Sequence, residues 1–238
     1  MKILFKVLIN IIDHTHKNKI ISFFKSKLDN KPINIIDVGA HKGETIELFS
    51  KNFNLKWIIC YEASKENFFL LKNQETKKID FNLEILNVAL GDKEKELDFF
   101  QTSESSSSTF CKINFNSNYF KRKKKILDFF NKENYIVNKE KIKLYTLNNE
   151  FKKFPIELVD ILKIDTEGFE FDVLKGASNI LKHIKYIYFE HHFDLMIMKN
   201  YKFSEINAFL KINNFTKIKK FKMPLRKTFE YIYENNTK

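Results

Sequence analysis

The stretch INIIDVGAHKG, residues 33–43, and the related stretch ILKIDTEG, residues 161–168, decide the fold that we predict for this chain. Each is an apolar run that stops on an aspartate and enters a turn containing glycine. A parallel strand passes into the crossover helix of an open α/β sheet in this way. Ligands of such sheets bind at the carboxyl ends of the strands, where the strand order reverses. We therefore expect Asp37 and Asp165 on the two sides of one crevice.

Further apolar runs continue this alternation of strand and helix. We expect additional strands at residues 57–61, 83–89 and 184–189, and helices at 43–53, 167–181 and 204–212. Two last strands are expected at 216–221 and 228–233. The six residues between them are too few for a crossover helix, so these two strands must be antiparallel neighbours.

The domain organisation follows from where this alternation fails. Residues 1–31 form a basic N-terminal helical extension, which we interpret as docked on the core rather than lying on an anionic membrane. Residues 32–238 form one domain, with an insertion at about 95–147 on the acceptor side. Its serine run, 103–108, fits a mobile linker or a polar loop facing a hydroxyl-rich substrate equally well. Its basic run, 121–125, favours a solvated helix face.

The composition restricts partners and location. A net charge of +12 suggests nucleic acid or an anionic membrane, but the excess Lys, Asn, Ile and Phe all have AT-rich codons, and base bias explains them as well. Cys60 and Cys111 belong to no CxxC pair, so a zinc site or disulfide framework is not indicated and a reducing cytoplasm is expected. We recognise no secretory leader, and no run approaches the roughly 20 apolar residues of a membrane span.

The first glycine turn has the wrong spacing for a diphosphate. A pyrophosphate turn places its outer glycines five residues apart, whereas Gly39 and Gly43 are four apart with His41 between them. S-adenosylmethionine carries no phosphate and suits this shorter turn. Glu62 ends the second predicted strand, where an acid accepts both ribose hydroxyls. NAD carries the same ribose, but the antiparallel C-terminal pair favours a methyltransferase over a dehydrogenase.

Several segments together resemble the FkbM-type methyltransferases. They are DVGAHKGET (37–45), YEAS (61–64), NVALGD (87–92), the serine run, LKIDTEGFEFDVLKGA (162–177) and IYFEHH (187–192). The resemblance covers about residues 33–192, and D-x-E-G-x-E joined to VLKGA is its most specific part. It implies a class I, S-adenosylmethionine-dependent O-methyltransferase with a Rossmann-like, seven-stranded, mostly parallel sheet, helices on both faces and an antiparallel last strand. It also implies a hydroxyl acceptor on a sugar, glycan or related metabolite.

The resemblance also implies roles for individual residues in cofactor binding. Asp37, Gly39, Ala40 and Gly43 would lie at the methionine end, Glu62 at the ribose, Ala89 at the adenine and Asp165 near the sulfonium. His41 departs from the family pattern because it is bulkier than the usual residue of this turn.

Asp165 is our first candidate for the general base, and Glu190 and His192 complete the predicted catalytic set. Glu167, Glu170 and His191 are the other polar groups expected at this edge, although a solvated strand end explains the histidine pair equally well. Asp165, Glu190 and His192 would suit a divalent ion, but no spacing requires one, and we predict no metal site.

We expect a small-molecule or glycan acceptor, with peripheral membrane contact open to the N-terminal helix. A nucleic-acid methyltransferase is the alternative suggested by the charge, but the chain lacks an Asn/Asp-Pro-Pro-Tyr tetrapeptide and a Pro-Cys nucleophile. A non-catalytic binding module is a further alternative, which the intact Asp37, Glu62 and Asp165 disfavour. The sequence predicts no oligomeric state.

Overall fold

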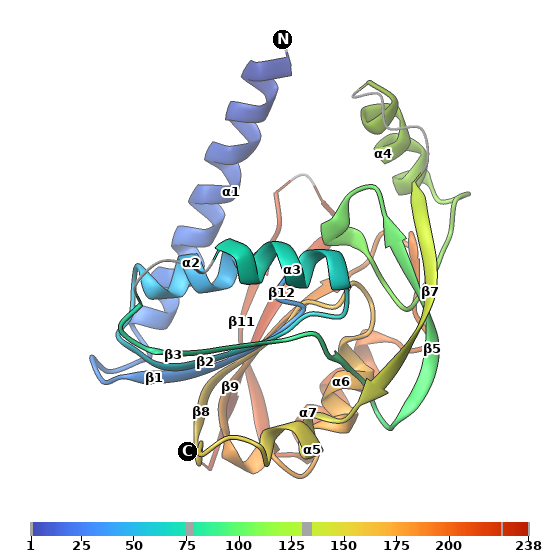
Figure 1. Cartoon of the computed structure of the whole chain (residues 1–238). Helices are drawn as coiled ribbons and strands as arrows, with labels where there is room; N and C mark the ends of the chain where they lie inside the picture. The colour runs from blue at the N-terminus through green and yellow to red at the C-terminus, as the bar shows by residue number, and fades with distance from the viewer. Residues whose placement is uncertain (1, 75–78, 130–134, 225, 238) are drawn as a thin grey trace.

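The computed structural model describes residues 2–74, 79–129, 135–224 and 226–237 (Figure 1). Side chains are described for these residues except 2–11, 74 and 127–129. The side chains at the start of the predicted N-terminal helix, residues 1–11, therefore lie outside the description.

A seven-stranded sheet forms the centre of the molecule, in the order β11-β12-β9-β8-β1-β2-β3. Its strands are β1 (Ile33–Val38), β2 (Leu55–Tyr61), β3 (Asn82–Leu86), β8 (Val159–Ile164), β9 (Ile184–His192), β11 (Phe215–Lys222) and β12 (Thr228–Asn235). β12 is antiparallel to both of its neighbours, and the other pairs are parallel. This confirms the predicted mostly parallel sheet with an antiparallel last strand. The strand order reverses between β1 and β8, as expected.

Helices cover both faces of the sheet (Figure 1). One face carries α1 (Lys2–Lys25), α2 (Glu44–Ser50) and α3 (Lys65–Gln74). The other carries α5 (Leu147–Phe151), α6 (Glu170–Gly176) and α7 (Phe203–Ile212). Buried apolar side chains of each group of helices pack against the sheet. The second half of α1 docks on the core, because Ile20, Ile21 and Phe24 are buried against the sheet. The first half projects away from the body.

The insertion builds a second, smaller sheet at the side of the molecule (Figure 1). β7 (Ile136–Tyr145) lies between β4 (Ala89–Leu90) and the antiparallel strand β5 (Lys95–Thr102). The helix α4 (Asn118–Phe129) carries the basic run, and a short antiparallel pair joins β6 (Lys112–Ile113) to β10 (Ile197–Met198). Within the described residues, none of the helices combines the length and apolar character that crossing a bilayer requires.

Several predicted boundaries were wrong, two of them because a turn intervenes. The third strand ends at Leu86, since Asn87 donates to the carbonyls of Glu62 and Ala63 and turns the chain into the second sheet. The helix predicted at 167–181 shortens to α6 because Glu167 and Gly168 have positive φ angles, 50° and 99°. The strand predicted to end at 189 continues through His192.

Gly176 is the one glycine inside a helix, and it lies where α6 contacts the smaller sheet. A Cβ atom at this position would lie 1.9 Å from the carbonyl oxygen of Gly91, which follows β4. A glycine in α6 therefore lets the helix that covers the main sheet touch the backbone of the smaller sheet.

We expect Gly176→Ala to lower the free energy of unfolding by about 1–3 kcal/mol, the usual cost of overpacking. The gain in helix propensity, about 1 kcal/mol, works in the opposite direction. Urea unfolding monitored by circular dichroism measures the difference, with the exposed helical change Lys211→Ala as control. An increase in stability for Gly176→Ala would contradict the close approach.

Candidate active site

A largely buried lysine, with 15% of its side chain exposed, joins the two predicted aspartates at the point where the strand order reverses. Lys163 on β8 is paired in register with Asp37 on β1, so both side chains leave the same face of the sheet. The Nζ atom of Lys163 lies 3.2 Å from Oδ1 of Asp37 and 3.6 Å from Oδ2 of Asp165. Burial alone would lower the pKa of Lys163, but the two carboxylates outweigh it and raise that pKa. Our sequence prediction missed this residue, although a lysine inside an apolar strand is a usable signal.

The glycine turn after β1 is fixed by its neighbours. The backbone N–H groups of Gly39 and Ala40 donate to the carbonyl of Tyr61 at 2.8 and 3.2 Å, which ties the turn to the end of β2. Gly39 has a φ of 84°, and a Cβ atom there would lie 1.9 Å from the carbonyl oxygen of Asp165. Only glycine allows this turn to pack against the loop after β8.

Glu62 follows β2 and lies at the wall of the adjacent pocket. One carboxylate oxygen accepts the backbone N–H of His41, and the other accepts that of Ser64, both at 2.8 Å. Burial raises the pKa of Glu62, while these two hydrogen bonds act to lower it. A carboxylate oxygen can accept a second hydrogen bond, so Glu62 retains acceptor capacity for two hydroxyl groups.

His41 connects the glycine turn to the serine run, and the two contacts of its ring give this large side chain a role in the turn. Its Nδ1 atom lies 2.8 Å from Oε1 of Glu44, and its Nε2 atom lies 2.8 Å from Oγ of Ser105. Burial would raise the pKa of Glu44, but the hydrogen bond and charge of His41 lower it to about 2. Ser105, Ser106 and Ser108 line the pocket. The serine run therefore forms a polar loop at the pocket wall, as one of the two interpretations of the sequence predicted.

The pocket has a volume of about 300 Å³ and lies at the carboxyl ends of β1 and β8. Of the residues predicted to bind the cofactor, Gly39, Ala40, Glu62, Ala89 and Asp165 line it. Asp37 and Gly43 are absent from the lining: Asp37 is fully buried and faces Lys163 instead.

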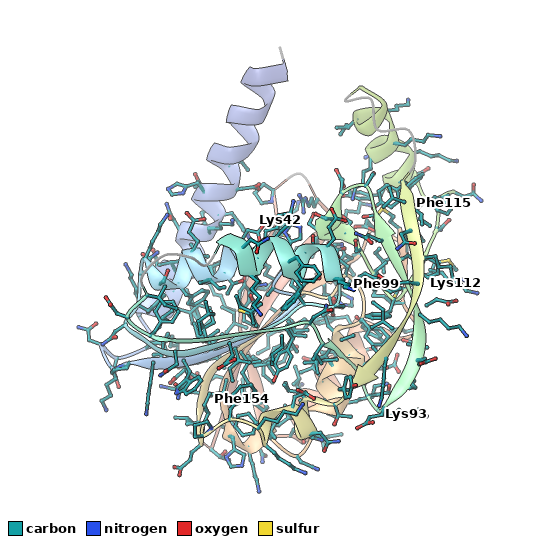
Figure 2. All side chains as sticks on the ribbon, viewed as in Figure 1. Lys42, Lys93, Phe99, Lys112, Phe115 and Phe154 are labelled. Atoms are coloured by element: carbon teal, nitrogen blue, oxygen red, sulfur yellow. The ribbon has the colours of Figure 1, made fainter. Side chains whose placement is uncertain are left out.

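Three phenylalanines form an apolar wall that the sequence did not predict. The ring centroids of Phe99 and Phe110 are 4.8 Å apart, and those of Phe110 and Phe169 are 5.2 Å apart. All three line the pocket. Figure 2 shows Phe99 on the side of β5 that faces the body of the molecule. The insertion therefore contributes part of the pocket rather than a separate surface.

Acidic groups gather at the end of the pocket away from Glu62. Asp165, Glu167 and Glu190 line this end, and His192 contacts both glutamates. Burial in the pocket raises the pKa of Asp165, and the Glu190 carboxylate raises it further. Burial would lower the pKa of His192, but Glu167 above all raises it.

The two histidines of β9 face opposite sides of the sheet. Both are buried, so the interpretation of a solvated strand end is wrong. The Nε2 atom of His191 lies 3.2 Å from Nζ of Lys199, and burial lowers the pKa of His191 to about 3. His191 therefore lies outside the site. Glu170 is also engaged elsewhere, since it accepts a hydrogen bond from Gly168 and another from Tyr201.

The N-terminal helix contributes to this end of the pocket, which the sequence did not reveal. His16 on α1 pairs with Glu230 on β12, and Tyr188 donates to the same carboxylate. His16, Tyr188 and Glu230 all line the pocket. The contact joins residues 214 positions apart, so no local sequence pattern indicates it.

We expect Lys163→Met to lower the free energy of unfolding by about 3–5 kcal/mol, because it leaves Asp37 buried without its charge partner. Adding Asp37→Asn should recover part of this loss. Urea unfolding measures both, with Lys143→Met, a surface lysine, as control. Equal losses for Lys163→Met and Lys143→Met would contradict the proposed charge pairing.

The chain was compared with known families, curated proteins and solved structures. Residues 37–217 match the methyltransferase FkbM domain family. No curated protein matches the sequence significantly. Many solved structures are similar to this chain. The M. capricolum TrmK structure, in complex with S-adenosyl-homocysteine, has a TM-score of 0.47 at 11% identity, covering 92% of this chain and 67% of that one.

The magnesium protoporphyrin IX methyltransferase ChlM from Synechocystis PCC 6803, with bound SAM, has a TM-score of 0.49 at 8% identity, covering 95% and 81% of the two chains. A SAM-dependent methyltransferase from Aquifex aeolicus has a TM-score of 0.48 at 13% identity, covering 90% and 89%. The family match spans most of the chain and includes the glycine turn, Glu62 and the D-x-E-G-x-E segment. The chain therefore belongs to the FkbM methyltransferase domain family and is an S-adenosylmethionine-dependent methyltransferase.

Proposed function

We propose that the protein methylates a hydroxyl group of a sugar, glycan or related metabolite. The observation that carries this proposal is the polar far end of the pocket. Asp165, Glu167, Glu190 and Arg226 line it, and the hydroxyls of the serine run line the wall nearby. Such a lining offers hydrogen bonds to several hydroxyl groups of one acceptor.

The proposed cofactor position uses the other end of the pocket. Gly39 and Ala40 would contact the methionine part, Glu62 would accept the ribose hydroxyls, and Ala89 would lie against the adenine. Asp37 and Gly43 would act from behind the wall by holding the turn. The residues fit the cofactor, because the buried Glu62 carboxylate faces the pocket with acceptor capacity to spare.

S-adenosylmethionine supplies a methyl group on a positively charged sulfur. The residues of this chain would hold the acceptor oxygen in line with that methyl, and alignment of this kind contributes up to about 7–11 kcal/mol. Asp165 would accept the hydroxyl proton. Its side chain lines the pocket and is 34% exposed, so an acceptor bound there can reach the carboxylate. General base catalysis typically contributes roughly a hundredfold to ten-thousandfold.

A nucleic-acid acceptor is the second candidate, favoured by α4. Lys121, Arg122, Lys124 and Lys125 are all exposed on this helix, and a basic surface attracts phosphates. Binding to mixed RNA measured against salt separates the two: specific use should survive moderate salt, whereas non-specific binding falls steeply. We also keep, as proposals, a peripheral membrane contact through the projecting half of α1 and a cytoplasmic location suited to two buried thiols.

We expect Glu62→Ala to weaken S-adenosylmethionine binding by about tenfold to a hundredfold, because a hydrogen bond to a charged group contributes roughly 1.5–3 kcal/mol. Isothermal titration calorimetry measures the change, and titration with NAD(H) should give no heat of binding. Glu84→Ala on β3, an exposed carboxylate, is the control. Unchanged affinity in Glu62→Ala would contradict the placement of the ribose.

We expect Asp165→Asn to lower kcat by roughly a hundredfold to ten-thousandfold, because the amide cannot accept the hydroxyl proton. The assay follows the labelled methyl group over a panel of sugars, lipids and RNA. Asp98→Asn, on the outer strand of the small sheet, is the control. Methylation of RNA alone, or full activity of Asp165→Asn, would contradict the proposed function.

A further inference from the structure

Three potential metal ligands converge at the far end of the pocket. One carboxylate oxygen of Glu167, one of Glu190 and a ring nitrogen of His192 all lie within 4.8 Å of one another. Glu190 and His192 are two residues apart on β9, so their side chains leave the same face of the strand. Glu167 reaches them from the loop after β8, where its φ of 50° turns the chain back. Both glutamates line the pocket.

The Nε2 atom of His192 is buried and makes no hydrogen bond within the described residues. It lies 3.1 Å from Oε2 of Glu167 and 3.0 Å from Oε1 of Glu190. Only 8% of the side chain is exposed, so bulk water is a poor substitute partner. A buried ring nitrogen between two carboxylates indicates a ligand that all three groups can bind.

The spacing of these atoms suits a metal ion. Two ligand atoms that are each about 2.1 Å from one ion, at right angles, lie about 3.0 Å apart. The two distances from His192 Nε2, 3.1 and 3.0 Å, have this value. Three protein ligands on one side of an ion would leave its remaining positions open, as at catalytic metal sites.

The other ring nitrogen of His192 has the partners that a metal-binding histidine normally has. Its Nδ1 atom lies 3.1 Å from Oγ1 of Thr228 and 3.4 Å from Oδ2 of Asp194. The Asp194 carboxylate is held in turn by the backbone N–H of Met196 at 2.9 Å. Such outer partners fix the ring and leave Nε2 directed at the metal.

Charge also favours a cation at this position. The carboxylates of Glu167, Glu190 and Asp194 surround the single imidazole of His192. Lys163 is engaged by Asp37 and Asp165, and Lys123 is paired with Glu104. Arg226 lines the same end of the pocket, and its charge acts on Glu167 and Glu190. This one guanidinium offsets only part of the charge of the three carboxylates, and a divalent ion would compensate the remainder.

We propose that Glu167, Glu190 and His192 bind one divalent transition-metal ion. Two carboxylate oxygens and one imidazole suit Mn²⁺ or Zn²⁺ better than Mg²⁺ or Ca²⁺, because Mg²⁺ and Ca²⁺ prefer sites made of oxygen ligands alone. An open position of the ion faces the pocket and takes the acceptor oxygen, a part of the proposal that rests on the proposed function. The ion would then orient the hydroxyl group beside Asp165.

The test is a titration of the chelator-treated, desalted full chain with Mn²⁺, followed by electron paramagnetic resonance of the unbound ion, and with Zn²⁺ by calorimetry. We expect one Mn²⁺ per chain. Glu190→Gln and His192→Gln should bind it at least tenfold more weakly, and Asp194→Asn roughly tenfold to a hundredfold more weakly because the histidine loses its orienting partner. Glu94→Gln, a surface carboxylate, should bind like the wild type.

Thermal unfolding shows whether each variant is folded. If a ligand variant does not fold, Asp194→Asn still tests the site, because it keeps all three ligands. No stoichiometric uptake of Mn²⁺ or Zn²⁺ by the wild type, or wild-type affinity for the ion in all three variants, would overturn the metal site. Titration of the same samples with S-adenosylmethionine is scored separately. A chain that binds the cofactor but no metal contradicts only this inference, whereas a chain that binds no cofactor contradicts the proposed function.

Discussion

The ion pair between Lys163 and Asp37 is the interaction on which the rest of the site depends. Asp37 is fully buried at the end of β1, and the cation on the neighbouring strand offsets the free-energy cost of removing its carboxylate from water. Lys163 also reaches Asp165, so the pair brings together the two loops that leave β1 and β8. The strand order reverses between these strands, and the pocket opens above them. One buried lysine thus links the fold to the site.

The parts of this structure that could be predicted are those with a local pattern. Apolar runs that end on Asp37 and Asp165 indicated β1 and β8, and the six-residue link indicated the antiparallel C-terminal pair. The spacing of Gly39 and Gly43 together with Glu62 indicated the cofactor side of the crevice. Residue-level resemblance supplied the family, which the match over residues 37–217 confirms.

The parts that could not be predicted depend on contacts between distant segments. Lys163 was not singled out because its partners come from another strand and a following loop. A catalytic role and a solvated strand end explained His192 equally well, and the structure excludes the second because β9 continues through His192 and buries it. Glu230 had no visible role because its partner His16 lies 214 residues away.

The insertion and the N-terminal helix both contribute residues to the pocket. The insertion supplies Phe99, Phe110 and the serine run, while α1 closes the opposite side through His16. Both additions therefore line a pocket whose floor is the main sheet. We therefore propose that these segments, which lie outside the repeating strand-and-helix pattern, contribute to the choice of acceptor.

The most direct test of this account is a crystal structure of the protein with S-adenosylhomocysteine. The account predicts that the ribose hydroxyls lie within hydrogen-bond distance of the Glu62 carboxylate and that the sulfur atom lies beside the loop carrying Asp165. A ligand bound outside the crevice between β1 and β8, or a Glu62 side chain directed away from the ribose, would contradict it.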